Sequence, residues 1–183
     1  MIRSILEGNR EAYAELIQAY QAKVLRLCSA LLRDPTLAQD AAQDIFLKTY
    51  QALGSFRGGA AFSTWLYRIA ANHCKDLLRQ RTRQRIESWE ALIEEQGEML
   101  QVLLTHPGDP RAAVVSADLI ERVLSQLAPE ERLILTLREM EGLSYQELAE
   151  ALACSIDAVK ARLRRARQTL HEKLRHISRP TSV

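Results

Sequence analysis

The chain has 183 residues, of which 47% are hydrophobic and 26% are charged. This balance is globular and excludes wholesale disorder, and the length allows one domain of ordinary size or two small ones. The net charge is only +2 because basic and acidic blocks nearly cancel: 13 basic and 7 acidic residues over 1–85, 1 and 6 over 86–115, 3 and 8 over 116–150, and 8 and 2 over 151–183. Two separate basic blocks on a near-neutral chain indicate a nucleic-acid-binding protein.

The first half of the sequence predicts three helices. Apolar residues over 9–32 recur at alternating steps of four and three, which is one face of a helix, and Asp34-Pro35 ends it. A second helix is expected over 36–53, with Gly54 as its cap and a loop over 55–61. A third helix is expected over 62–85. Its inward face would hold Phe62, Leu66, Ile69, His73 and Leu77.

The second half changes character at about residue 86. The acidic segment 86–115 is weakly amphipathic and ends in a cluster of Pro and Gly, which predicts a linker between domains with some helix in it. Further helices are expected at 112–127, 129–141, 145–152 and 156–176. The fold class that follows is all-α: two small helical domains, residues 1–85 and 116–183, joined by an acidic linker.

Residues 145–164 predict a helix-turn-helix of the kind that reads DNA. Ser144 begins an S-x-x-E capping box, and Ser155 can cap the second helix after a short turn. The inward face of that helix is apolar, with Leu163 taking the packing role next to Arg162. The opposite face holds Lys160, Ala161, Arg164, Arg165 and Gln168. Its arginines can pair with guanine edges, and its arginines and lysine can hold phosphates. The alternative is a basic amphipathic helix exposed to water, or a tail on a helical bundle.

A second constellation lies on the third predicted helix, where one face combines an aromatic ring, an amide and cations: Trp65, Arg68, Asn72, Lys75 and Arg79. The preceding loop adds Phe56 and Arg57. Rings beside cations suit bases that have left the duplex stack, where stacking contributes roughly 1–3 kcal/mol per base. The alternative is that Trp65 and Tyr67 belong to the core and that Asn72 ties down a loop. On the second predicted helix, a polar stripe of Asp40, Asp44 and Lys48, with Gln43 beside it, is by itself typical of an ordinary solvated face.

Taken together, these segments resemble a bacterial sigma factor of the sigma-70 family, in its compact extracytoplasmic-function group. Residues 40–58 (DAAQDIFLKTYQALGSFRG) resemble the helix that binds core polymerase and the loop that follows it. Residues 62–83 resemble the segment that binds the minus-ten promoter element, and residues 127–170 resemble the reader of the minus-thirty-five element. The resemblance therefore covers nearly the whole chain, in the order that the family requires.

The resemblance implies a role for each group. The residues that match contacts to the β′ clamp helices of core RNA polymerase are Asp40, Gln43, Asp44 and Lys48. Asn72 matches the position that captures a flipped base of the minus-ten strand, near a pocket formed with Phe56 and Arg57. The rest of that face, Trp65, Arg68, Lys75 and Arg79, is expected on minus-ten DNA. The minus-thirty-five surface is expected to hold Ser155, Lys160, Ala161, Arg164, Arg165 and Gln168. The family further implies contact with the polymerase β flap and an anti-sigma partner.

Other classes of protein fit the sequence less well. No nucleophile–base set is evident, so neither catalytic residues nor a small-molecule substrate is expected. Cys28, Cys74 and Cys154 lie far apart, which favours buried reduced thiols over a metal site or disulfides, and no cofactor is expected. No run approaches 18 apolar residues and no signal core is evident, so a cytoplasmic protein is expected. The rival functions are a ligand-sensing helix-turn-helix repressor and an RNA-binding helical protein.

Overall fold

A computed structural model describes the main chain of residues 2–95 and 126–177, and the side chains of 2–84 and 126–175. Every regular element within those ranges is helical. The first half contains α1 (Ile2–Leu6), α2 (Arg10–Leu32), α3 (Pro35–Ala52), the short 3₁₀ turn η1 (Leu53–Ser55) and α4 (Phe62–Glu95). The second half contains α6 (Pro129–Leu135), the π-helical turn η3 (Thr136–Met140), α7 (Tyr145–Ala151) and α8 (Ile156–Ile177). The all-α fold class is thus confirmed.

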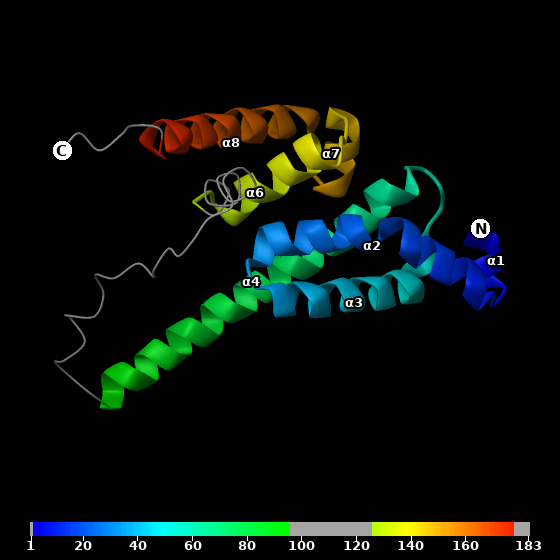
Figure 1. Ribbon diagram of the computed structural model, residues 1–183, viewed down its shortest axis with the longest axis horizontal. Coiled ribbons are helices and arrows are strands. Elements are labelled where there is room, and N and C mark those ends of the chain that lie inside the picture. Colours follow the sequence, from blue (N-terminus) through cyan, green and yellow to red (C-terminus); the bar gives the residue numbers. More distant parts are fainter. Residues whose placement is uncertain (1, 96–125, 178–183) are drawn as a thin grey trace.

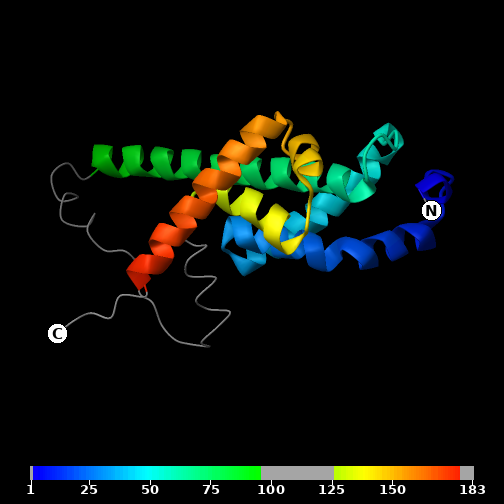
Figure 2. The same ribbon diagram turned by 90° about the horizontal axis from the view of Figure 1, so that it is seen from above.

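Helices α2, α3 and α4 pack against one another, α6 packs on α2 and α7 on α4, and α8 packs on α6 and α7 (Figure 1). Seen from above, α8 crosses over α4, and α4 extends well beyond α2 and α3 (Figure 2). One continuous apolar core joins the two halves: Leu27 and Leu31 of α2, Leu66 of α4, Leu148 of α7 and Leu163 of α8 all belong to it. The halves therefore form a single packed body.

Polar caps determine where the helices begin. The Asn9 side chain accepts a hydrogen bond from the amide of Ala12, and the Asp34 side chain accepts one from Leu37, both at 3.1 Å. Pro35 occupies the first turn of α3, where its missing N–H costs nothing. The predicted start of α2 and the break at Asp34-Pro35 are confirmed.

Two boundary predictions were wrong, and helix α1 was not predicted. The third helix continues to Glu95 instead of ending at Arg85, because the composition changes there without any breaker. Gly54 does not cap α3; that helix ends at Ala52 and tightens into η1. The predicted helix over 112–127 and the rest of the linker lie almost wholly outside the described residues.

Two of the three cysteines are buried free thiols, as the sequence predicts. Cys28 of α2 and Cys74 of α4 are free thiols in the core with sulfur atoms 3.7 Å apart. The contact to Cys74 and burial raise the pKa of the Cys28 thiol far above its usual range, which keeps it protonated and unreactive. Cys154 differs because it lies in the turn after α7 and is partly exposed.

Candidate functional site

The polar stripe of α3 faces solvent. The opposite side of the helix is buried, including Ala38, Ala41 and Ile45, so its geometry leaves the candidate polymerase-binding residues outside. All four are exposed: Asp40, Gln43, Asp44 and Lys48. Leu47 lies among them and is 57% exposed. The sequence pattern does not single out this leucine, because an apolar residue on an amphipathic helix is ordinarily assigned to the core.

This surface is tied to α4 through His73. The Nζ of Lys48 lies 2.7 Å from Nδ1 of His73, and Nε2 of His73 lies 3.5 Å from a carboxylate oxygen of Asp44. Burial lowers the pKa of His73, as does the Lys48 charge, while Asp44 and Asp76 oppose the shift. The imidazole is therefore neutral near pH 7, with Nδ1 accepting a hydrogen bond from the Lys48 ammonium, while Nε2, 3.5 Å from the Asp44 carboxylate, makes no hydrogen bond among the described residues.

The predicted aromatic–amide–basic face of α4 divides into two parts. Arg68, Asn72 and Arg79 are exposed and Lys75 is half-buried, as expected of a binding face. Trp65 departs from that expectation because it is only 8% exposed. Its ring packs against aromatic rings of the preceding loop and the start of α4, with centroid distances of 5.3 Å to Phe56 and 5.7 Å to Phe62. Burial thus matches the core alternative for Trp65 and for Tyr67, which is 2% exposed, but part of Trp65 still lines the cavity at this loop.

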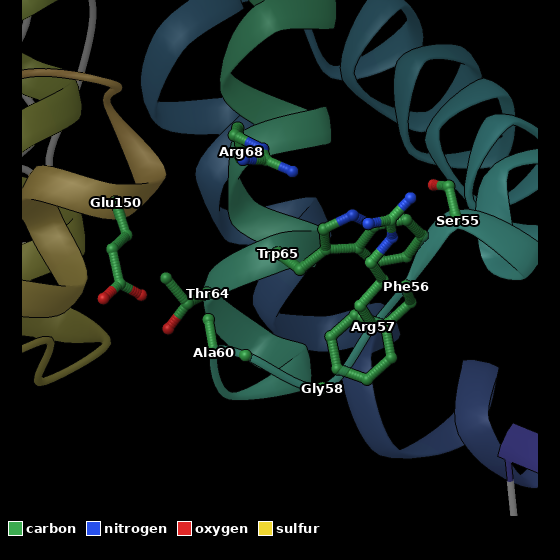
Figure 3. A pocket seen from close by; sticks show the side chains of 10 residues that line it. Ser55, Phe56, Arg57, Gly58, Ala60, Thr64, Trp65, Arg68 and Glu150 are labelled. Atoms are coloured by element: carbon green, nitrogen blue, oxygen red, sulfur yellow. The ribbon is translucent and has the colours of Figure 1, made fainter.

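A cavity of about 240 Å³ opens where this loop meets α4 (Figure 3). The loop contributes Phe56 and Arg57, α4 contributes Trp65 and Arg68, and α7 of the second half contributes Glu150. Gly58 in the loop has φ of 71°, a left-handed conformation that favours glycine. The cavity thus combines flat rings with two guanidinium groups, which suits a nucleobase and its phosphates. Asn72 is not among the residues that line it.

The helix-turn-helix forms as its caps predict. Ser144 Oγ accepts a hydrogen bond from the Glu147 amide at 3.2 Å, and Glu147 accepts one from the Ser144 amide at 2.8 Å. These hydrogen bonds lower the pKa of Glu147. After α7 the chain turns at Ala153, whose φ is 49°, and Ser155 Oγ then accepts from the Ala158 amide at 3.2 Å to begin α8. Ser155 is therefore engaged as a helix cap.

Helix α8 is divided as predicted between an inward and an outward face. Val159, Leu163 and Ala166 are buried, and Leu163 is 1% exposed, which confirms that it takes up the packing beside exposed Arg162. The outward candidates are all exposed: Lys160, Ala161, Arg164, Arg165 and Gln168. Two of these side chains have partners on the same helix, since Lys160 lies 3.2 Å from Asp157 and Gln168 donates to Glu172 at 3.1 Å.

The described residues contain no cluster of metal-binding side chains and no helix that could cross a membrane. What they present is one polar face on α3 and two basic faces, on α4 and α8. These surfaces are suited to binding macromolecules.

Comparisons with known proteins also indicate a protein that binds macromolecules. The family profile described as Sigma-70 region 2 matches residues 16–84, and that described as Sigma-70, region 4 matches residues 117–170. The RNA polymerase sigma-H factor of Pseudomonas aeruginosa is 35% identical over 98% of this chain and 94% of its own length. The ECF RNA polymerase sigma-E factor of Escherichia coli is 34% identical over 98% and 95%.

Two solved structures share the fold with a TM-score of 0.70. One is CnrH in complex with the cytosolic domain of CnrY, with 24% identity over 97% of this chain and 96% of that one. The other is the sigma factor RpoE in complex with the anti-sigma factor NepR from Bartonella quintana, with 23% identity over 92% and 99%.

Proposed function

The chain belongs to the sigma-70 family of RNA polymerase sigma factors, in its extracytoplasmic-function group, and from that premise we propose how its surfaces divide the work of initiation. It is a factor that binds core RNA polymerase and directs promoter-specific transcription initiation. The observation that carries the assignment of surfaces is the separation of one polar helix face from two basic ones on a continuous helical body.

In our proposal, α3 binds core polymerase. Asp40, Gln43, Asp44 and Lys48 contact the clamp helices of β′, and Leu47 is the apolar anchor between them. An exposed leucine surrounded by polar groups resembles the apolar centre and polar rim of a protein–protein interface. The second half contacts the β flap.

The loop before α4 and the exposed face of α4 bind melted minus-ten DNA. Arg57 and Arg68 hold the strand beside the cavity, and an extruded base enters against Phe56 and Trp65. Extruding a base costs a few kcal/mol of unstacking, which ring contacts and hydrogen bonds offset. Asn72, with Lys75 and Arg79 further along α4, contacts the same strand outside the cavity.

The outer face of α8 enters the major groove of the minus-thirty-five element. Lys160, Arg164 and Arg165 reach bases or phosphates, with Ala161 allowing close approach, while Gln168 contacts the flank. Ser155 supports this helix as its cap, so its contribution to DNA contact is through its backbone and position.

Partner proteins follow by analogy with relatives. The similar structures named above contain CnrY and the anti-sigma factor NepR, and we propose that an anti-sigma factor also controls this chain. The factor acts by binding and not as an enzyme, and it works in the cytoplasm beside core polymerase.

The test is run-off transcription with core polymerase on a library of randomised promoters. Transcripts that require the factor, from templates sharing two elements, are the expected result. A ligand-sensing repressor would instead bind a palindromic duplex without polymerase, and an RNA-binding protein would prefer structured RNA at matched salt. Either outcome, without factor-dependent transcripts, would overturn the proposal.

A further inference from the structure

The two halves of the molecule share a buried carboxylate. Glu141 follows η3 in the second half, and its side chain is only 1% exposed. One oxygen accepts hydrogen bonds from Nη2 and Nε of Arg26 in α2, at 3.0 and 3.1 Å. The other accepts from the hydroxyl of Tyr67 in α4 at 2.8 Å. Both oxygens of Glu141 are therefore held by the first half.

Tyr67 makes the loss of Glu141 from this contact unfavourable. Burial raises the pKa of its hydroxyl, and the hydrogen bond to Glu141 raises it further, so the group remains a protonated donor. If Glu141 were lost while the halves stayed together, the Tyr67 hydroxyl would be left in the core without that acceptor. A buried polar group without a partner is unfavourable, so Glu141 favours the packed arrangement specifically.

A second contact crosses the interface in the opposite direction. Arg132 of α6 donates to the carbonyl oxygen of Leu31 at 3.3 Å, close to the carboxyl end of α2. Arg132 is 5% exposed, and burial lowers its pKa from the usual arginine value. A cation at a helix carboxyl end is favourable, so this contact supports the same packing.

The packed arrangement brings the two candidate DNA surfaces together. A cavity of about 760 Å³ is lined by Lys75 and Arg79 of α4 and by Arg162 and Arg165 of α8. Glu150 of α7 lines the smaller cavity together with Arg68, so a carboxylate occupies the rim where nucleic acid would enter (Figure 3).

That geometry conflicts with promoter binding. Elements centred near minus ten and minus thirty-five lie about 25 base pairs apart, or about 85 Å along B-DNA at about 3.4 Å per base pair. Arg79 and Arg165 cannot line one cavity and also contact elements at that separation. The halves must therefore part before both surfaces are used.

We propose that Glu141, through its hydrogen bonds to Arg26 and Tyr67, stabilises this closed form of the factor. We call this set of contacts the latch. The proposal rests on the assignment of α4 and α8 to promoter DNA. Opening breaks the three hydrogen bonds to Glu141, withdraws Glu150 from the cavity and frees both basic faces. Core polymerase and DNA then select the open form.

The experiment measures closure directly, by energy transfer between dyes on the two halves. Labels are attached at Gln18→Cys and His171→Cys, both exposed positions, in a Cys154→Ser background. Glu141→Lys places a like charge against Arg26 and is expected to lower the closed-to-open ratio at least about tenfold. Combining it with Arg26→Glu restores opposite charges and is expected to recover most of that ratio.

Two further variants test whether the effect is specific to the contacts of Glu141. Glu139→Lys makes the same charge change two residues away, but Glu139 pairs with Arg167 inside the second half at 2.8 Å, so the ratio should stay within about twofold. Tyr67→Phe removes only one hydroxyl and keeps the ring, and it should open the molecule about threefold even if the lysine variant folds poorly.

The outcomes separate the latch from the proposed function. Unchanged energy transfer in both Glu141→Lys and Tyr67→Phe would overturn the latch, as would opening in Glu141→Lys that the Arg26→Glu exchange does not reverse. Opening without faster association with core polymerase would overturn its inhibitory role. If neither wild type nor open variants bind polymerase at all, the proposed function fails, while the energy-transfer result still decides the latch.

Discussion

Lys48 of α3 and His73 of α4 are joined by a contact of 2.7 Å between the ammonium and the imidazole Nδ1. The contact requires a neutral imidazole, because a protonated one would present a second donor to the ammonium. It links the candidate polymerase-binding face to the helix that carries Asn72, one residue before His73. The protonation state of His73 therefore bears on the contact between α3 and α4, and through it on stability.

The first prediction concerns pH. Burial and the Lys48 charge lower the pKa of folded His73, so the unfolded chain takes up the proton first as pH falls below about 6.5. The free energy of unfolding should therefore fall as the pH drops from about 6.5 toward the lower pKa of folded His73. At higher pH, His73 should contribute no pH dependence. Urea unfolding at pH 7.5 and 5.5 should show a smaller loss for His73→Gln, which keeps an acceptor for Lys48.

The matched control is His171→Gln on α8, where the side chain is exposed. It should lose as much stability as wild type between the two pH values. An equal loss in all three proteins would show that His73 does not titrate differently in the folded state.

The second prediction separates binding from folding on α3. Leu47→Ala should change the free energy of unfolding by less than about 0.5 kcal/mol, because its side chain is 57% exposed. It should weaken core polymerase binding about tenfold, as loss of an apolar interface anchor does. Asp44→Arg should weaken capture in a polymerase pull-down as well. Leu6→Ala, at 55% exposure on α1, is the matched control and should bind normally.

The third prediction concerns the minus-ten strand. Asn72→Ala should reduce open complexes about tenfold, the effect of losing an amide contact to a base edge, while core binding persists. Permanganate reactivity of promoter thymines measures the melting. Gln80→Ala removes an exposed amide from the same helix and should leave melting intact. Unchanged transcription from every cognate promoter would remove Asn72 from the DNA contact.

The fourth prediction concerns α8. Arg165→Ala should weaken the footprint over the minus-thirty-five element about tenfold, because it removes an exposed cation from the outward face. Arg167→Ala is the comparison, since that guanidinium is engaged by Glu139 at 2.8 Å and should matter less. Equal losses in both variants would indicate that α8 contributes charge alone, and an unaltered footprint would mean that the helix docks differently.

The accuracy of the sequence-based predictions depended on how local the responsible interactions are. The start of α2 at Asn9 and the box at Ser144 involve bonds between residues three apart, and both were predictable from sequence. Trp65 was misassigned to an exposed face because periodicity identifies a face without showing what covers it. The loop ring of Phe56 folds back onto Trp65, and no spacing within α4 encodes that.

The interface between the halves could not be predicted from the sequence for the same reason. Arg26 and Glu141 are 115 residues apart, and no sequence pattern singled out either of them. Their pairing depends on how α2 and η3 meet in space, which single-sequence patterns do not specify. The predicted surfaces were therefore largely exposed as expected, whereas their convergence on shared cavities emerged only in three dimensions.

The last prediction concerns the turn of the helix-turn-helix. Ala153 has φ of 49°, a left-handed conformation in which its Cβ is strained, and it follows α7 at the position where glycine commonly ends a helix. Ala153→Gly should relieve that strain and raise the free energy of unfolding by about 0.5–1 kcal/mol, despite the greater freedom of glycine in the unfolded chain. Urea unfolding measures the gain. The same substitution at exposed Ala14 within α2 should instead lower stability by about 1 kcal/mol, because glycine is unfavourable inside a helix. Opposite signs at the two positions would establish that backbone strain at Ala153 is the cause. A loss of stability in both would show that Ala153 is unstrained and that the turn tolerates its side chain.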